Sequence, residues 1–192
     1  MNTTALIVDT EILSDKRYIL KEVTVNYTDS NGETQTTKRE VYERGDAAAA
    51  ILYNPSTRMV VLLNQFRLPT FLNGNPKGVL TEVCAGMLDN DTPEICIRRE
   101  ITEETGYVIK EVYPAGEIYV SPGGCTERIY LFIAPYTPEM KTAAGGGLKE
   151  EQEYIEIEEL PYEESLQLIA QGKIKDAKTI VLLYHLRING LM

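Results

Sequence analysis

Short apolar segments of strand type, separated by polar turns, recur along this 192-residue chain, and helical patterns lie between and after them. Residues 18–44 alternate apolar and polar side chains on both sides of a turn at Asn31 and Gly32, which predicts a β-hairpin. Residues 47–53 and 59–66 are apolar runs separated by a polar turn, which predicts a second strand-turn-strand unit. Because strands and helices of this kind bury one face each, the pattern predicts a layered α+β or α/β domain.

The rest of the chain continues the pattern with further strands, three helices and two long loops. Strands are predicted at 79–83, 111–120, 128–136 and 154–160, helices at 93–105, from about 161 to 171 and from about 176 to 188, and glycine-bearing loops at 69–78 and 137–153. A loop as long as the second one is usually functional or mobile. We therefore predict a β appendage at residues 1–45 and a layered domain at residues 46–192.

Composition and charge exclude several classes of function. The chain has 19 Lys and Arg against 29 Asp and Glu, a net charge of −10, which argues against nucleic acid as a partner. Its amino end lacks the pattern of a signal peptide, and no segment approaches the roughly 20 apolar residues of a membrane span. Three widely spaced cysteines are typical of reduced thiols, so we expect a cytoplasmic protein without a membrane partner.

The single histidine, His185, removes much metal and nucleophile chemistry from consideration. Histidine-rich zinc sites need several imidazoles, and a Ser-His-Asp triad would need this one ring together with a nucleophile motif that the sequence lacks. We expect His185 to be a surface or partly buried helix residue.

The helix predicted at 93–105 has well-defined ends. Thr92 can cap its first amides, Pro93 suits the first helical position, and Gly106 follows its last residue. Its last turns carry several glutamates, although acids are normally unfavourable at the C-terminal end of a helix.

Glu100 and Glu104 lie one helical turn apart on the same face, and Glu103 lies beside them. Like charges at this spacing cost roughly 0.2–0.5 kcal/mol per pair, and the helix dipole adds roughly 0.3–1 kcal/mol. Arg99 stands four residues before Glu103 and offsets part of this cost, but it leaves the other two glutamates without an evident partner. Either the acids form a solvated face of an acidic protein, or a divalent cation such as Mg²⁺ binds them together with substrate phosphates.

The segment from Gly86 to Tyr107 resembles the Nudix box of the Nudix hydrolase superfamily. The family pattern is a glycine, five residues, a glutamate, seven residues and then R-E-U-x-E-E-x-G-U, where U is a bulky apolar residue. The stretch "REITEETGY", which begins at Arg99, fits the second half in full. The first half departs from the pattern, because Asp91 stands where glutamate is usual and only four residues separate it from Gly86.

Residues outside the box extend the resemblance over nearly the whole chain. Pro122, fifteen residues beyond the box, resembles a mark of the ADP-ribose and nucleotide-sugar pyrophosphatase branch, and "KREVYERG", "NQFR", "CAGMLDND", "SPGGCTE" and "AGGG" resemble bacterial GDP-mannose pyrophosphatases. The resemblance implies an α+β fold, an α/β/α sandwich with a mixed β-sheet, and an antiparallel amino-terminal appendage that forms a homodimer.

The same resemblance implies a reaction. A Nudix hydrolase with Mg²⁺, or alternatively Mn²⁺, as cofactor would cleave the pyrophosphate of a nucleotide sugar, with GDP-mannose giving GMP and mannose 1-phosphate. ADP-ribose, giving AMP and ribose 5-phosphate, is the alternative substrate. A non-catalytic module that senses nucleotide sugars is the alternative from another class, although such modules generally lose a box glutamate and this chain keeps all three.

The resemblance also assigns roles to individual residues. The implied metal ligands are the backbone carbonyl of Ala85 and the carboxylates of Glu100, Glu104 and Glu153; the implied catalytic residues are Glu151 as base, with Arg99 and Glu103 orienting the ligands. A shift of register in the acidic loop would move the base to Glu150.

Substrate contacts are implied along most of the chain. Binding an anion to so acidic a protein requires placed cations, and guanidinium groups pair bidentately with phosphate, so Arg67 is the leading candidate. The implied substrate-binding residues are Arg17, Tyr18, Lys38, Arg39, Glu40, Arg67, Gly86, Met87, Glu127, Glu150 and Asp176. Arg39 and Glu40 would act on the substrate of the neighbouring subunit.

Overall fold

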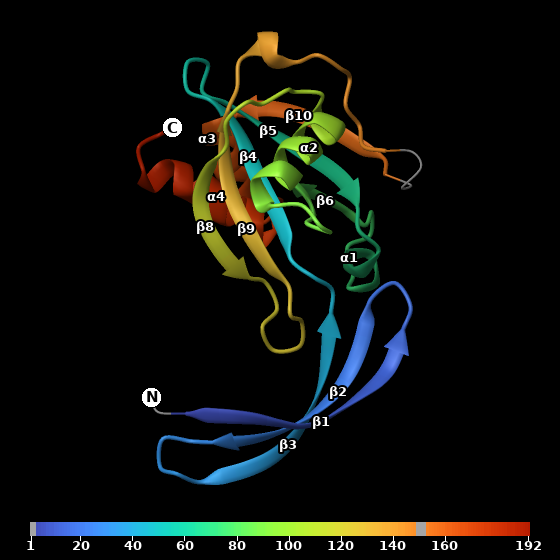
Figure 1. Cartoon of the computed structure of the whole chain (residues 1–192). Coiled ribbons are helices and arrows are strands. Elements are labelled where there is room, and N and C mark those ends of the chain that lie inside the picture. Colours follow the sequence, from blue (N-terminus) through green and yellow to red (C-terminus); the bar gives the residue numbers. More distant parts are fainter. Residues whose placement is uncertain (1–2, 149–152) are drawn as a thin grey trace. The chain divides into compact units, whose positions relative to one another are not determined.

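The computed structural model describes residues 3–148 and 153–192 of the chain (Figure 1). The chain divides into two compact units. The first contains residues 1–46 together with 119–128, and the second contains residues 47–118 and 129–192.

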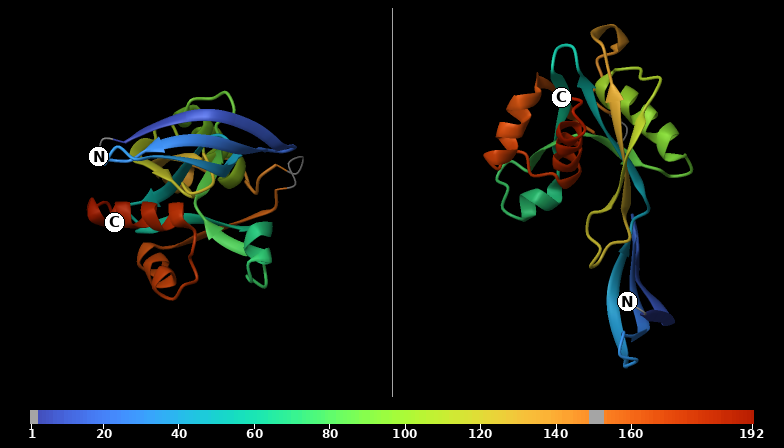
Figure 2. Two further views of the ribbon diagram at one scale, coloured as in Figure 1. Left: turned by 90° about the horizontal axis from the view of Figure 1, so that it is seen from below. Right: turned by 90° about the vertical axis from the view of Figure 1, so that its left-hand side faces the viewer.

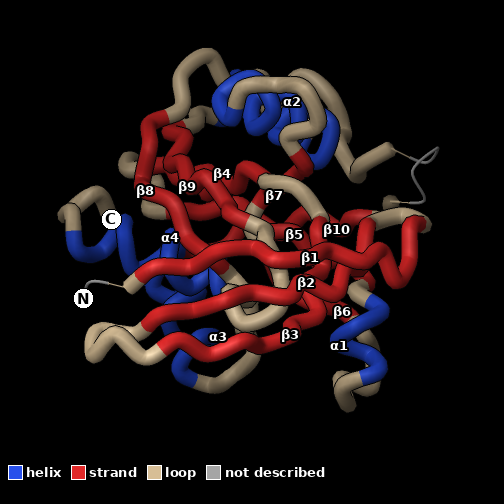
Figure 3. Tube along the Cα trace, turned by 60° about the horizontal axis from the view of Figure 1, so that its bottom comes forward, coloured by secondary structure: helices blue, strands red, loops and turns tan. Residues whose placement is uncertain are grey.

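The first unit is an antiparallel sheet of three strands in the order β1-β2-β3 (Figure 3). Its strands are β1 (Thr4–Asp15), β2 (Ile19–Thr28) and β3 (Thr34–Glu43). The β2–β3 pair is the hairpin that the alternating pattern predicts. β1 was not predicted as a strand, because its register against β2 shifts twice and each shift moves later side chains to the other face, so that no period of two persists.

Apolar side chains of β1 are exposed to an unusual degree for a strand. The exposed fractions are 66% for Leu6, 67% for Ile7 and 57% for Ile12. Several apolar side chains of the amino-terminal sheet therefore remain accessible within the unit.

The segment 119–128 joins this unit by hydrogen bonds from the Tyr42 amide to the Gly124 carbonyl (2.8 Å) and from the Thr126 amide to the Tyr42 carbonyl (3.1 Å).

The second unit contains a mixed sheet in the order β10-β5-β4-β9-β8, with β6 paired to β5 and β7 paired to β4. Its strands are β4 (Ala47–Asn54), β5 (Met59–Phe66), β6 (Val79–Glu82), β7 (Cys84–Met87), β8 (Tyr113–Tyr119), β9 (Arg128–Pro135) and β10 (Ile155–Pro161). β4 runs parallel to β9 and antiparallel to β5 and β7. Every residue of β4 is buried, as expected of a strand covered on both faces.

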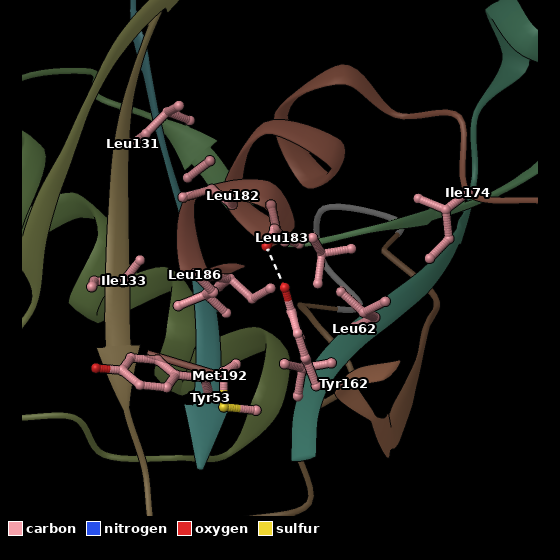
Figure 4. Packing of buried hydrophobic residues seen from close by; sticks show 14 of the residues in the cluster. Tyr53, Leu62, Leu131, Ile133, Tyr162, Ile174, Leu182, Leu183, Leu186 and Met192 are labelled. Carbon is pink, nitrogen blue, oxygen red and sulfur yellow. Dashed lines mark hydrogen bonds between the residues drawn. The ribbon is translucent and has the colours of Figure 1, made fainter. Parts of the chain in front are cut away.

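Helices cover both faces of this sheet, which confirms the predicted α+β sandwich (Figure 2). α2 (Pro93–Thr105) lies on one side, and α3 (Tyr162–Ala170) and α4 (Ala177–Ile188) lie on the other. Alternate residues of β4 enter different cores: Ala49 packs with the leucines of α4, whereas Ala50 packs with Ile97 and Ile101 of α2. The α4 side of the core is drawn in Figure 4.

The predicted strands and helices of this unit agree with the structure to within two residues at each end. Three short elements were missed: β7, the five-residue helix α1 (Leu68–Leu72) inside the first predicted loop, and the 3₁₀ turn η1 (Pro138–Met140) inside the second. Elements of three to five residues are too short to show a period. None of the described helices has the length and apolar content needed to cross a membrane.

Candidate active site

The ends of α2 are fixed by local interactions that the sequence predicts. The Thr92 hydroxyl accepts a hydrogen bond from the Ile95 amide at 3.5 Å. Gly106 ends the helix in the left-handed conformation, with φ of 77°, and its amide donates to the Thr102 carbonyl. A Cβ atom at Gly106 would also overlap the Ala143 carbonyl. The position of the last helical turn, which carries the glutamates, therefore depends on a glycine.

Glu100 and Glu104 are buried on the face of α2 that meets β7, with exposed fractions of 9% and 3%. Glu104 Oε2 accepts hydrogen bonds from the Ala85 amide at 3.1 Å and from the Cys84 thiol at 2.7 Å. A Cβ atom at Gly86 would overlap the Glu100 carboxyl group. The structure therefore brings together both glutamates and the β7 backbone at Ala85 and Gly86.

Burial of this pair changes its acid-base properties. Desolvation raises the pKa of Glu104 to about 8, and the negative charges of Glu100 and Glu153 add to the effect. Desolvation likewise raises the pKa of Glu100 to about 7, although the neighbouring Arg99 opposes the rise. The solvated acidic face considered from sequence is thus excluded for these two residues, because both carboxyl groups are largely withdrawn from water.

The chemistry of the donor set fits a hard divalent cation. A cation would favour the ionised form of both carboxyl groups, and Mg²⁺ prefers oxygen ligands. Among residues 3–148 and 153–192, no cluster of three or more His, Cys, Asp or Glu side chains is arranged to hold a metal by side chains alone. A cation here would therefore need backbone oxygen, water or substrate phosphate as well, which is the usual way in which proteins hold Mg²⁺.

Arg99 joins the acidic groups at the surface of this cluster. Its Nη1 lies 2.8 Å from Glu100 Oε1 and 3.2 Å from Glu103 Oε2, and its Nε lies 3.5 Å from Asp91 Oδ2. The sequence argument expected Arg99 to reach Glu103 and to leave Glu100 without a partner, and the structure corrects that expectation. Asp91, which departs from the family pattern, still belongs to the same ion-pair network.

Residues 145–147 connect the end of α2 to the segment that carries Glu153. The Gly146 amide donates to the Glu104 carbonyl at 2.9 Å, and the Gly147 amide donates to the Glu103 carbonyl at 3.2 Å. Glu153 Oε2 accepts from the Leu148 amide at 3.3 Å. An open cavity of about 400 Å³ is lined by these glycines and by Glu153, Tyr154, Ile155 and Glu156. Glu150 and Glu151 lie outside the described residues.

Arg67 lies in a network of alternating charges. Its Nε and Nη2 donate to the two oxygens of Glu82 at 2.7 and 3.2 Å. Lys178 Nζ contacts Glu82 at 2.5 Å and Asp176 at 2.9 Å. Asp176 also caps α4 by accepting from the Thr179 amide. Both Arg67 and Asp176 are therefore engaged by protein groups.

Other residues assigned to substrate from sequence belong to the first unit. The guanidinium groups of Arg17 and Arg44 lie over the Tyr18 ring, at 5.6 and 5.5 Å from its centroid. Glu127 is buried and pairs with Arg44 at 3.4 Å.

Three neighbouring candidates lie along β3. Lys38 pairs with Glu22 at 2.5 Å, whereas Arg39 and Glu40 are exposed. Met87, also assigned to substrate from sequence, ends β7 with its side chain packed against the core. The single histidine, His185, is partly buried on α4, as expected from sequence.

Sequence reasoning missed Cys84, Glu82 and Lys178 as members of these networks. Glu82 and Lys178 carry a usable signal, because each is an isolated charge inside an otherwise apolar segment, "VLTEV" and "AKTIVLLY". Charged residues are almost never fully buried unless they are paired, so each should have suggested a buried partner. Cys84 carries no comparable signal, since a small buried thiol is an ordinary core residue.

Comparison with known proteins identifies the family. The model for the NUDIX domain matches residues 43–182. The chain belongs to the Nudix family. A second model, described as the GDP-mannose pyrophosphatase NudK N-terminal domain, matches residues 5–42. The Nudix box predicted from sequence therefore lies within a full domain of that family, and the matches together span both compact units.

Individual relatives resemble the Nudix chain over its whole length. A protein named GDP-mannose pyrophosphatase from Enterobacter sp. (strain 638) is 49% identical over 97% of this chain and 96% of its own. A protein of the same name from Salmonella typhimurium is 46% identical over 100% of both chains. A solved structure titled as an ADP compounds hydrolase matches with a TM-score of 0.73 over 97% of this chain and 95% of its own, at 16% identity. This last likeness shows the shared fold.

Proposed function

We propose that this Nudix hydrolase is a Mg²⁺-dependent cytoplasmic enzyme that cleaves GDP-mannose to GMP and mannose 1-phosphate. The observation that carries the proposal is the buried pair Glu100 and Glu104 against the β7 backbone, because it supplies two carboxylates without a counter-ion of equal charge. The identity of 46–49% over the full length to proteins named GDP-mannose pyrophosphatase supports the substrate.

The residues that would hold the cation are Glu100, Glu104 and the backbone carbonyl of Ala85. Glu153, which the family resemblance adds, would join them only when the metal binds, because the described residues form no cluster of three acidic side chains arranged for a metal. Bound Mg²⁺ supplies polarisation of the phosphoryl oxygens, a lower pKa of a coordinated water, and stabilisation of the leaving phosphate. Mn²⁺, also an oxygen-binding cation, is the alternative. The Ala85 amide and the Cys84 thiol hold one oxygen of Glu104, so the orientation of its carboxyl group is set before any ligand binds.

The remaining roles follow from charge and position. Arg99 and Glu103 orient Glu100, and Glu151, or Glu150 in the other register, would take the proton of the attacking water. Arg67, Gly86, Met87 and Asp176 would contact the diphosphate and sugar. From the first unit, Arg17, Tyr18, Lys38 and Glu127 would contact the substrate, and Arg39 and Glu40 would act on that of the neighbouring subunit.

The substrate is tested by incubating the purified protein with Mg²⁺ and a panel of nucleotide sugars that includes GDP-mannose and ADP-ribose. We expect GMP and mannose 1-phosphate as products and loss of turnover when EDTA removes the metal. Hydrolysis in ¹⁸O-labelled water identifies the attacked phosphorus by the product that carries the label. Preferred turnover of ADP-ribose would overturn the substrate, and binding without turnover would support a sensing module instead.

The first unit also supports a homodimer. β1 exposes several large apolar side chains, among them Leu6, Ile7 and Ile12, and exposed apolar surface on an edge strand commonly marks an interface. A second copy of the chain is the expected occupant, as the resemblance implies. We expect the protein to sediment as a dimer and Ile7→Lys to shift it toward the monomer, because a charge would be placed in the interface.

Analytical ultracentrifugation at several concentrations measures this shift. Ile188→Lys is the matched control, since Ile188 is 82% exposed on α4, in the second unit. A wild-type protein that remains a monomer at all concentrations would contradict the proposal, and so would an equal effect of both substitutions.

A further inference from the structure

Glu82 is a buried acid at the end of β6 with three charged hydrogen bonds. Its exposed fraction is 4%, yet it accepts from Arg67 Nε at 2.7 Å, from Arg67 Nη2 at 3.2 Å and from Lys178 Nζ at 2.5 Å. The bidentate pair fixes the plane of the Arg67 guanidinium, because both hydrogen bonds must lie along that plane. Glu82 therefore restrains the direction in which Arg67 points.

Lys178 donates to the same carboxylate, at the Oε2 atom that Arg67 Nη2 also contacts. Its side chain is 10% exposed, and it bridges Glu82 to Asp176 at 2.5 and 2.9 Å. The second oxygen of Asp176 accepts from the Thr179 hydroxyl at 2.6 Å, and that hydroxyl accepts from the Val83 amide at 2.8 Å. The network thus ties α4 to the end of β6 and leaves Glu82 little freedom to move.

The charges of this network balance, with two cations against two acids. The positive charges of Lys178 and Arg67 outweigh the desolvation of Glu82 and lower its pKa, so the carboxyl group stays ionised. A buried ion pair is weak evidence for stability, since apolar residues of similar volume often serve as well. We therefore looked beyond stability for the role of the Glu82–Lys178 pair, to its effect on Arg67.

Arg67 keeps capacity for a further ligand. Its side chain is 41% exposed, and among the described residues its Nη1 has no hydrogen-bond partner. Desolvation alone would lower the pKa of Arg67, but the hydrogen bonds and charge of Glu82, with smaller contributions from Glu104 and Asp176, raise it, so the group stays charged. Because the side chain is partly exposed and Nη1 is unpaired among the described residues, Arg67 can donate to a ligand without breaking its pair with Glu82.

We propose that Glu82 and Lys178 are positioning residues that hold the Arg67 guanidinium in the orientation that binds the diphosphate of the substrate. This inference rests on the proposed function and adds two buried residues to its substrate-binding machinery. A preformed orientation reduces the conformational entropy that a long side chain loses when it binds a ligand. The pair would thus act on binding of substrate and transition state alike, and little on the chemical step.

The test is the double variant Glu82→Gln/Lys178→Met, which removes the two charges of the buried Glu82–Lys178 pair together. Asp176 loses its contact with Lys178 but keeps the hydrogen bonds from the Thr179 amide and hydroxyl. We expect KM for GDP-mannose to rise about tenfold and kcat to stay within about twofold, the result of losing uniform binding. Glu163→Gln is the matched control, because Glu163 also pairs with two cations, Arg58 and Arg187, but is exposed. Its KM should equal that of the wild type.

A double-mutant cycle separates positioning from a merely structural effect. In an Arg67→Met background, Glu82→Gln/Lys178→Met should change KM no further, because its effect passes through Arg67. Additive effects of Arg67→Met and Glu82→Gln/Lys178→Met on KM would overturn the proposal. An unchanged KM when Glu82→Gln/Lys178→Met is made in the otherwise wild-type protein would overturn it as well.

Two further measurements keep the outcome clear. Binding of GDP, measured calorimetrically, should weaken about tenfold in the double variant whether or not the wild type hydrolyses GDP-mannose. Inactive wild-type protein with this change in affinity would overturn the proposed function alone. If the variant unfolds, the NMR order parameter of the Arg67 Nε–H bond in the wild-type protein tests the positioning role, and we expect it to show a more rigid side chain than that of the exposed Arg17. Equal mobility of the two side chains would overturn the positioning role.

Discussion

Glu104→Gln is expected to lower kcat for GDP-mannose hydrolysis by at least about a hundredfold while the fold is retained. Glutamine keeps the shape of the side chain and can still accept the hydrogen bond from the Ala85 amide. It lacks the negative charge that a divalent cation requires. Steady-state kinetics at saturating Mg²⁺, with Mn²⁺ affinity measured by electron paramagnetic resonance, provides both readouts.

Glu94→Gln provides the matched control on the same helix. Glu94 is an exposed acid in the first turn of α2, far along the helix from Glu104, and its loss should leave kcat and Mn²⁺ affinity unchanged. Wild-type activity in Glu104→Gln would remove this carboxylate from the mechanism. Loss of activity with unchanged Mn²⁺ affinity would instead assign Glu104 a role other than metal binding.

Metal-free protein should lose stability as pH rises from about 5 to 8. The pKa values of Glu100 and Glu104 in the folded protein are about 7 and about 8, above the ordinary value of 4.5. Groups with raised pKa values favour the folded state fully below pH 4.5, and this contribution is lost as pH rises through their folded pKa values. The expected loss in the free energy of unfolding is on the order of a few kcal/mol, since one pKa unit corresponds to about 1.4 kcal/mol.

Urea denaturation in EDTA at several pH values measures this loss, and added Mg²⁺ should reverse it more strongly at pH 8 than at pH 6. The double variant Glu100→Gln/Glu104→Gln is the control, because it should flatten the profile. Glu82, whose pKa is lowered, acts with the opposite sign and only below about pH 4.5, outside this window. A flat wild-type profile in EDTA between pH 5 and 8 would show that the buried pair is not destabilising.

Local sequence signals predicted most of the second unit. Thr92 and Gly106 mark the two ends of α2, and the apolar run 47–53 before a polar turn indicates a strand, which the structure shows to be buried throughout. The box glutamates were found because helical spacing alone places Glu100 and Glu104 on one face. β1 escaped prediction because its two register shifts depend on the pairing with β2.

The sequence by itself determined which acids share a helical face and which family motif they belong to, because both depend on spacing along one segment. Only the tertiary structure decided that this face is buried against β7, and so that desolvation raises the pKa values of its two carboxyl groups. It alone also joined Arg67, Glu82 and Lys178, from three separate elements, into one network. Desolvation and charge pairing depend on distances in space, and these follow from packing between elements far apart in the chain.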